Sequence, residues 1–84
     1  MFSKIHEECG VFGIYSSGRA DVAGLTYSAL FALQHRGQES CGIAINDDGV
    51  ISGYKDLGLV GEVFSPERLQ KLGRGQLAVG HVRY

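Results

Sequence analysis

The chain has 84 residues, of which 44% are hydrophobic and 20% are charged, and its formal net charge is −1. This length allows one small domain, and the near-neutral charge excludes the basic surface that nucleic-acid binding requires. No apolar run approaches the roughly 18 residues of a membrane-spanning helix, and the charged first segment is unlike a signal peptide. Two cysteines without a secretory signal do not make a disulfide scaffold. We therefore expect a cytoplasmic protein that contacts neither nucleic acid nor membrane.

The first part of the chain predicts a strand followed by a helix. Residues 10–15 combine β-branched and aromatic side chains with two glycines, which predicts a buried strand, and residues 16–18 then predict a turn. Asp21 is placed to cap the N-terminus of a helix over residues 22–35, because apolar residues recur there at intervals of three and four. Gly37 fits the stop signal just past the end of this helix.

The middle of the chain predicts a β-hairpin. Residues 41–46 and 50–54 are two strand-like runs, and the Asp-Gly pair at residues 48–49 between them favours a tight hairpin turn. Residues 56–64 contain two glycines and predict a loop.

The last part predicts a short helix and a final strand. Ser65-Pro66-Glu67 supplies an N-cap, a first-turn proline and an early acidic residue, and Gly73 marks the helix end. Residues 77–84 are strand-like, and strands placed first, after one helix and last predict an α+β sheet layered against helices. Because the sequence stops inside this apolar run, we expect a fragment whose sheet face is incompletely covered.

Several chemistries do not fit the spacing of the reactive residues. Gly73–Gly75 lacks the third glycine of a dinucleotide-binding loop and the Lys-Ser/Thr pair of a phosphate loop, so it predicts a turn. Cys9, Cys41, His35 and His81 lack the paired spacing that zinc sites require. We expect no metal site in this chain and interpret Cys41 as a core side chain.

Cys9 lies between a polar leader and the first predicted strand. One interpretation is a small buried hydrophobic residue at a strand edge. The other is a nucleophile, since a thiol with a pKa of about 8.5 needs a base at neutral pH and an α-amino group with a pKa of about 7.7–8.0 can supply it. Only removal of residues 1–8 would give Cys9 a free α-amine, so processing would act as a switch.

Three motifs in chain order carry a resemblance to a known family. They are Cys-Gly-Val-Phe-Gly-Ile from Cys9, Leu-Gln-His-Arg-Gly-Gln-Glu-Ser-Cys-Gly-Ile from Leu33, and Gly-His-Val-Arg-Tyr from Gly80. Together they resemble the N-terminal glutaminase domain of the amidophosphoribosyltransferases, which are class II, or N-terminal-nucleophile (Ntn), glutamine amidotransferases. The block from Gln34 to Gln38 is similar to this family, whereas the equivalent block of the hexosamine-forming relatives looks more like Tyr-Arg-Gly-Tyr.

The resemblance covers essentially the whole chain and implies a fold and domain limits. The implied fold is the N-terminal part of the four-layer αββα sandwich of Ntn hydrolases, an α+β fold with mostly antiparallel sheets that is incomplete in this chain. Residues 1–8 resemble a propeptide cleaved between Glu8 and Cys9, which leaves 9–84 as a partial type 2 glutamine amidotransferase domain. The family's oxyanion-hole residues would lie beyond Tyr84, so we expect this segment alone to be inactive.

The resemblance also implies roles for individual residues. Cys9, once N-terminal, would be the catalytic nucleophile, and Arg83 would bind the α-carboxylate of glutamine through its planar guanidinium. Arg36, Gly37 and His81 would support the site. Without the motifs, a surface ion pair is the preferred interpretation of Arg83, and Arg36 could instead cap a helix end. His81 is interpreted as ordering its strand by hydrogen bonding and not as transferring protons.

The implied function is the glutaminase half of an enzyme that opens purine biosynthesis. Glutamine hydrolysis would supply ammonia to phosphoribosyl pyrophosphate, which binds a C-terminal domain absent here, to form 5-phosphoribosylamine. No cofactor is expected in this segment; magnesium, a 4Fe-4S cluster bound by downstream cysteines and homo-oligomers are expected only in a full-length enzyme. Two alternatives remain: the glutaminase domain of another class II enzyme such as glutamine–fructose-6-phosphate transaminase, or a noncatalytic interaction module with the same fold.

Overall fold

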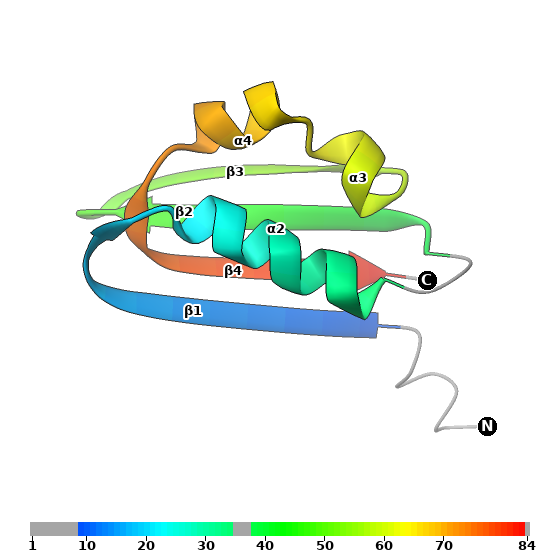
Figure 1. Cartoon of the computed structure of the whole chain (residues 1–84), viewed down its shortest axis with the longest axis horizontal. Coiled ribbons are helices and arrows are strands. Elements are labelled where there is room, and N and C mark those ends of the chain that lie inside the picture. The colour runs from blue at the N-terminus through cyan, green and yellow to red at the C-terminus, as the bar shows by residue number, and fades with distance from the viewer. Residues whose placement is uncertain (1–8, 35–37, 84) are drawn as a thin grey trace.

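A computed structural model of the chain describes residues 9–34 and 38–83. In chain order the elements are β1 (Cys9–Ala20), α2 (Val22–Leu33), β2 (Ser40–Asp47), β3 (Val50–Leu57), α3 (Val60–Val63), α4 (Pro66–Leu72) and β4 (Gly75–Arg83). The four strands form one sheet in the order β1-β4-β2-β3, and every neighbouring pair is antiparallel (Figure 1). The predicted α+β class, with an antiparallel sheet against helices, is confirmed.

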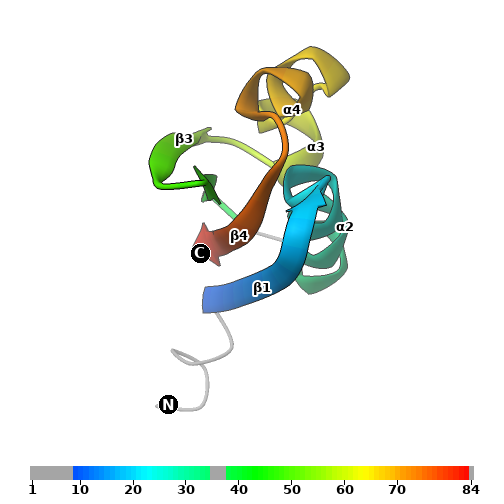
Figure 2. The same cartoon turned by 90° about the vertical axis from the view of Figure 1, so that its left-hand side faces the viewer.

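The helices lie on one face of the sheet, and the opposite face carries none of the described elements (Figure 2). The core therefore forms between the helices and the covered face. Its buried hydrophobic members come from both layers, and they are Val22, Ala23, Leu30, Cys41, Ile43, Ile45, Val60, Phe64, Leu72, Ala78 and Val82. Among the described residues, no helix is long and apolar enough to cross a membrane.

Strand β1 is longer than the sequence predicts. The turn expected at residues 16–18 is wrong, because β1 continues to Ala20, which pairs with Gly75 of β4. The register shifts between Tyr15 and Ala20, so the small polar residues occupy an irregular stretch of an edge strand instead of a chain reversal. The chain reverses only at Asp21, where α2 begins.

Helix α2 begins as predicted and ends slightly early. The Asp21 carboxylate accepts a hydrogen bond from the Gly24 backbone N–H at 3.1 Å, which satisfies one of the free donors of the first turn. The helix ends at Leu33, and Gln34 is already extended with ψ of 132°. The stop predicted at Gly37 lies outside the described residues.

Close approach of α2 to the sheet depends on Gly80. A Cβ atom at Gly80 would lie 2.6 Å from Thr26 Cγ2 and 2.9 Å from Leu30 Cδ1. Thr26 and Leu30 are fully buried, so the helix rests directly on the backbone of β4.

The β2–β3 hairpin is confirmed. Asp48 and Gly49 both have positive φ, of 53° and 90°, which is the backbone geometry that an Asp-Gly pair favours in two-residue hairpin turns. The Asn46 side chain adds a hydrogen bond from the Gly49 N–H at 2.9 Å.

The loop predicted over residues 56–64 is only partly correct. Strand β3 continues to Leu57, and α3 adds one helical turn at Val60–Val63. The following helix α4 is confirmed, since Ser65 Oγ accepts a hydrogen bond from the Arg68 N–H and Gly73 ends the helix with φ of 81°. Residue Gly58, with φ of 127°, lets the chain turn from β3 toward α3.

Candidate active site

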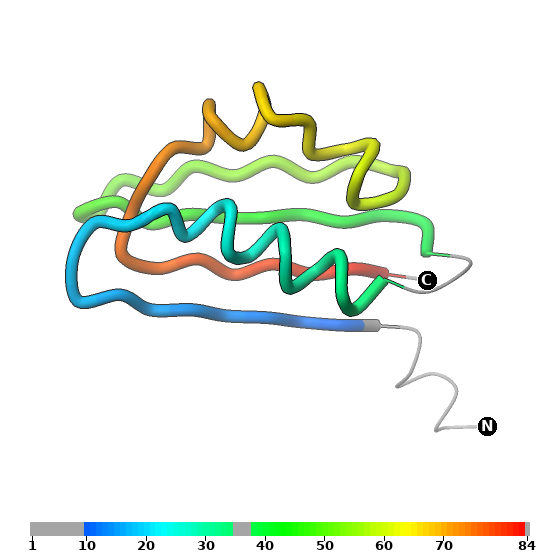
Figure 3. The backbone as a smooth tube through the Cα atoms, in the orientation of Figure 1, coloured from blue at the N-terminus to red at the C-terminus, as the bar shows by residue number. Residues whose placement is uncertain are grey.

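Residues from all three sequence motifs lie together at one end of the sheet. The register of β1 and β4 pairs Cys9 with Arg83, and the register of β2 and β4 pairs Ser40 with the same Arg83. The Glu39 N–H donates a hydrogen bond to the Arg83 carbonyl oxygen at 2.8 Å. The start of β1, the start of β2 and the end of β4 therefore lie together, at the right-hand side of Figure 3.

This convergence follows from the antiparallel order of the strands. Strand β4 lies between β1 and β2 and runs opposite to both, so its last residue meets the first residues of its two neighbours. Along β4, Ala78, Gly80 and Val82 are buried beneath the helices. Alternation along the strand then places His81 and Arg83 on the open face of the sheet.

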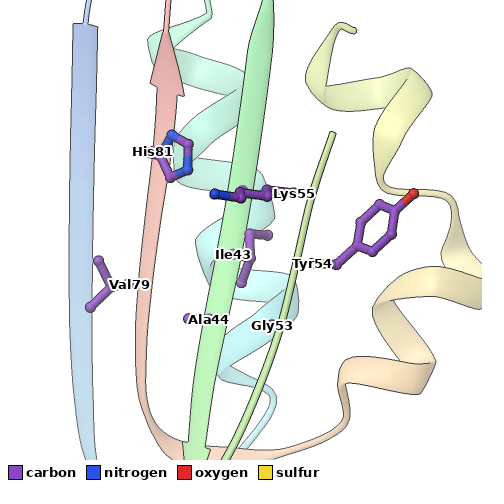
Figure 4. Close-up of a pocket in the computed structure, with 8 residues that line it drawn as sticks. Ile43, Ala44, Gly53, Tyr54, Lys55, Val79 and His81 are labelled. Atoms are coloured by element: carbon purple, nitrogen blue, oxygen red, sulfur yellow. The ribbon is translucent and has the colours of Figure 1, made fainter. Parts of the chain in front are cut away.

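The open face next to this edge is shaped by Gly42. A hollow of about 350 Å³ is lined by Gly42, Ala44, Gly53, Lys55, Val79 and His81 among others (Figure 4). A Cβ atom at Gly42 would lie 2.6 Å from His81 Nε2 and 2.9 Å from Lys55 Cβ. Figure 4 shows the Lys55 side chain extending across β2 toward His81. The missing side chain at Gly42 thus allows a histidine and a lysine to occupy the same part of the open face.

Cys41 is placed in the core, as expected from the sequence. The side chain is fully buried, and its Sγ lies 3.8 Å from the Gly58 carbonyl oxygen. Burial, and secondly the carboxylate of Asp56, raise the pKa of the Cys41 thiol to about 11. The thiol is therefore protonated at neutral pH and unsuited to nucleophilic attack.

Asp56 itself is held in its charged form by its neighbours. The Leu57 backbone N–H donates to Asp56 Oδ1 at 2.8 Å, and the Tyr54 hydroxyl donates to Asp56 Oδ2 at 3.0 Å. These two hydrogen bonds lower the pKa of the Asp56 carboxyl. The guanidinium carbon of Arg68 lies 3.7 Å from the centre of the Tyr54 ring, so this contact ties α4 to β3.

Some of the predicted site residues are not placed by the structure. Glu8, Arg36 and Gly37 lie outside the described residues, and Cys9 is described as a strand position at the start of β1. Arg83 is exposed and His81 is half-buried. Of the predicted set, the structure brings together Cys9 and Arg83 by register, with His81 two residues before Arg83 on the same face.

One residue with many contacts was missed by sequence reasoning. Gln38 is nearly fully buried, and its side-chain amide makes hydrogen bonds to three backbone groups. The sequence places Gln38 in a polar block just before β2, where nothing in the hydrophobic pattern distinguishes a buried amide from an exposed one.

The described residues do not fit a metal centre. Within residues 9–34 and 38–83, no three His, Cys, Asp or Glu side chains gather closely enough to hold an ion. The magnesium ion and the iron–sulfur cluster are expected only for a full-length enzyme, and no chemical step here is derived through either group.

Comparison with curated proteins finds close sequence relatives. The chain is 54% identical over 78 residues to an amidophosphoribosyltransferase of Mycobacterium tuberculosis, covering 93% of this chain and 14% of that protein. It is 57% identical over 76 residues to an amidophosphoribosyltransferase of Methanocaldococcus jannaschii, covering 90% of this chain and 16% of that protein. No protein-family model matches the chain.

Solved structures share the fold. A structure described as the allosteric regulatory enzyme of purine biosynthesis superposes with a TM-score of 0.79 at 43% identity, over 88% of this chain and 15% of that one. Glutamine phosphoribosylpyrophosphate amidotransferase from B. subtilis superposes with a TM-score of 0.67 at 39% identity, over 90% of this chain and 15% of that one.

The shared fold defines the class of protein: the chain has the fold of the N-terminal part of a glutamine amidotransferase. More particularly, the chain belongs to the amidophosphoribosyltransferase family, whose N-terminal region it matches. The chain spans between 14% and 16% of the length of the two curated relatives described above. Neither of those relatives is a hexosamine-forming enzyme.

Proposed function

We propose that the chain is the glutaminase part of an amidophosphoribosyltransferase, and that removal of residues 1–8 at the Glu8–Cys9 bond creates an N-terminal nucleophile at Cys9. The observation that carries the proposal is the register that pairs Cys9 with Arg83 at the end of the sheet. Attack on the side-chain amide of free glutamine requires two groups: a reactive thiol, and a guanidinium that binds the α-carboxylate. Glutamine is proposed as the substrate because it stands in the name of the similar B. subtilis enzyme.

The N-terminal position gives the thiol its own base. The α-amine of a terminal cysteine has a pKa near 8 and takes the thiol proton, so that the sulfur attacks the side-chain carbonyl carbon of glutamine. The amine returns that proton to the leaving nitrogen, ammonia departs and a thioester remains. Water then attacks the thioester, which releases glutamate and restores the thiol. The net reaction converts glutamine and water into glutamate and ammonia.

Arg83 is the proposed anchor for the α-carboxylate of glutamine. Its guanidinium is exposed on the open face, and a planar fork of N–H donors matches a carboxylate in a bidentate arrangement. His81 and Lys55 add basic groups to the same face, which favours an anionic substrate group there. Arg36 and Gly37 are proposed to support the site from the segment between α2 and β2.

The ammonia is proposed to react outside this segment. In a full-length enzyme it would displace pyrophosphate from phosphoribosyl pyrophosphate to give 5-phosphoribosylamine. The relatives' name and the B. subtilis structure support glutamine and phosphoribosyl pyrophosphate as the two substrates. A cytoplasmic location, homo-oligomers and the downstream magnesium and iron–sulfur groups remain part of the proposal for the full-length enzyme.

The proposal is tested by Cys9→Ser in the full-length enzyme. We expect glutamine-dependent formation of 5-phosphoribosylamine to fall at least about a hundredfold, because a hydroxyl is a much weaker nucleophile than a thiol, while activity with added ammonia is kept. Cys41→Ala is the matched control and should keep both activities. Glutamine-dependent activity that survives Cys9→Ser would support the noncatalytic alternative for this segment.

A further inference from the structure

The Gln38 side chain is a buried connection between three segments of the chain. Only 5% of the residue is exposed. Its Nε2 donates to the Ser40 carbonyl oxygen at 2.9 Å and to the Gly58 carbonyl oxygen at 2.7 Å. Its Oε1 accepts from the Val60 N–H at 3.2 Å. Because a buried amide is costly when unpaired, this fully used set of donors stabilises one specific arrangement of these backbones.

The backbone on either side of Gln38 strengthens this connection. The Gly58 N–H donates to the Glu39 carbonyl oxygen at 2.6 Å, so the Gln38–Glu39 pair holds Gly58 through both its N–H and its carbonyl group. Gln34 Oε1 also accepts from the Val60 N–H, at 2.9 Å. The two glutamines that flank residues 35–37 therefore meet at the first residue of α3.

The same segment holds the end of β4. The residue after Gln38, Glu39, donates its N–H to the Arg83 carbonyl oxygen at 2.8 Å, and Ser40 is the register partner of Arg83. On its other side Arg83 pairs with Cys9. The contacts therefore run from the Gln38 amide through two consecutive backbone residues to the strand end that carries Arg83.

We propose that Gln38 is a positioning residue for glutamine binding: its amide fixes residues 38–40, and these fix Arg83 relative to Cys9. This inference rests on the proposed glutaminase function. Loss of the amide leaves the carbonyl groups of Ser40 and Gly58 without their donor and loosens the backbone that Arg83 hydrogen-bonds. The affinity for glutamine then decreases, because a misplaced guanidinium binds the substrate carboxylate less tightly.

The test uses the full-length enzyme with Gln38→Met, which keeps the length of the side chain and removes its hydrogen bonds. We expect the KM for glutamine to rise about tenfold, the effect of losing one charge-assisted hydrogen bond. Activity with added ammonia should stay within about twofold, since ammonia does not bind Arg83. Gln70→Met, at an exposed position on α4, is the matched control and should change neither quantity.

A second variant keeps the test decisive if Gln38→Met does not fold. Gln38→Glu keeps the shape and the acceptor but replaces the two donors, so it should raise the KM for glutamine in the same direction. A purely structural role would lower kcat with glutamine and with ammonia in proportion and leave the KM for glutamine unchanged, and that result would overturn the inference. Failure of the glutaminase proposal is distinguishable, because in that case the Cys9→Ser variant would keep its glutamine-dependent activity.

Discussion

At the scale of single residues, the two cysteines have different chemical roles because of where they lie. Cys41 belongs to β2 and is buried in the core between the sheet and the helices. Cys9 is the first residue of β1 and lies beside the end of β4. Burial that raises the pKa of Cys41 to about 11 makes this thiol unreactive. The same burial couples its titration to the stability of the fold.

We predict that stability decreases as the pH rises from about 9 toward 11, because the unfolded Cys41 thiol loses its proton near its ordinary pKa of 9.0 while the folded thiol retains it to about 11. Denaturant unfolding at a series of pH values measures this effect. Cys41→Ala serves as the control, and its unfolding free energy should fall less over the same range. Equal slopes for the two proteins would show that the thiol contributes nothing.

Arg83 offers a second prediction at this scale. Arg83→Lys in the full-length enzyme keeps the charge but loses the planar fork, so the KM for glutamine should rise about 10- to 100-fold, in keeping with the loss of a charge-assisted hydrogen bond. Steady-state assays with glutamine and with ammonia separate this effect from unfolding. Arg74→Lys, at an exposed position just before β4, should leave both assays unchanged. An unaltered KM for Arg83→Lys would remove this residue from the substrate site.

At the scale of elements, the packing of α2 on the sheet is set by a residue without a side chain. Gly80 is the point where Thr26 and Leu30 of α2 come within contact of the β4 backbone. Val82 and Ala78, on either side of it along the covered face, are fully or almost fully buried. Any side chain at Gly80 would therefore have to separate the helix from the sheet along this line.

Gly80→Ala should lower the free energy of unfolding by about 1–3 kcal/mol, because overpacking at a fully buried contact forces the layers to move. The measurement is urea denaturation. Gly18→Ala is the control, since a Cβ atom there meets nothing within 4 Å, and its effect should stay within about 0.5 kcal/mol. Equal effects of the two substitutions would mean that α2 is not seated as described.

Elements with local signals were predictable, and elements held by distant partners were not. The Asp48-Gly49 hairpin and the α4 limits at Ser65 and Gly73 follow from backbone preferences of the residues themselves. The extension of β1 through residues 16–18 depends on pairing with β4, far away in the sequence. The single turn of α3 begins where Gln34 and Gln38 accept its first N–H, which no local pattern encodes.

The candidate site shows the same limit. Motif resemblance singles out Cys9 and Arg83, but the strand order β1-β4-β2-β3, which brings them into register, is a property of the whole sheet. The burial of Gln38 likewise arises from how three segments meet, because the residue itself is as polar as the exposed Gln70. Physical contact between distant segments was the missing information in both cases.

At the scale of the whole molecule, the two faces of the sheet are unlike each other. One face is covered by helices, and the other exposes hydrophobic side chains from several strands: Val11, Tyr15, Ile51, Leu57, Leu77 and Val79. Val11 and Tyr15 are each 73% exposed. Exposed apolar side chains gathered on one face can bind other apolar molecules.

We expect the isolated 84-residue chain to bind an apolar fluorescent dye strongly, because this face is accessible to solvent. Val11→Thr combined with Val79→Thr should reduce the dye fluorescence, since threonine keeps the strand preference and the volume while removing apolar surface. Val50→Thr is the control, because Val50 is exposed but alternates with Ile51 and lies off this face. Unchanged fluorescence in the double variant would place the dye elsewhere.

The central claim is that Cys9 becomes the N-terminal nucleophile that acts on glutamine, and one mass-spectrometric measurement tests it most directly. The full-length enzyme is treated with a chloroketone analogue of glutamine, and the modified N-terminal peptide is identified. The account predicts a chain that begins at Cys9 and carries one label on that residue. A chain that still begins at Met1 and carries no label at Cys9, or a label on Cys41, would contradict it.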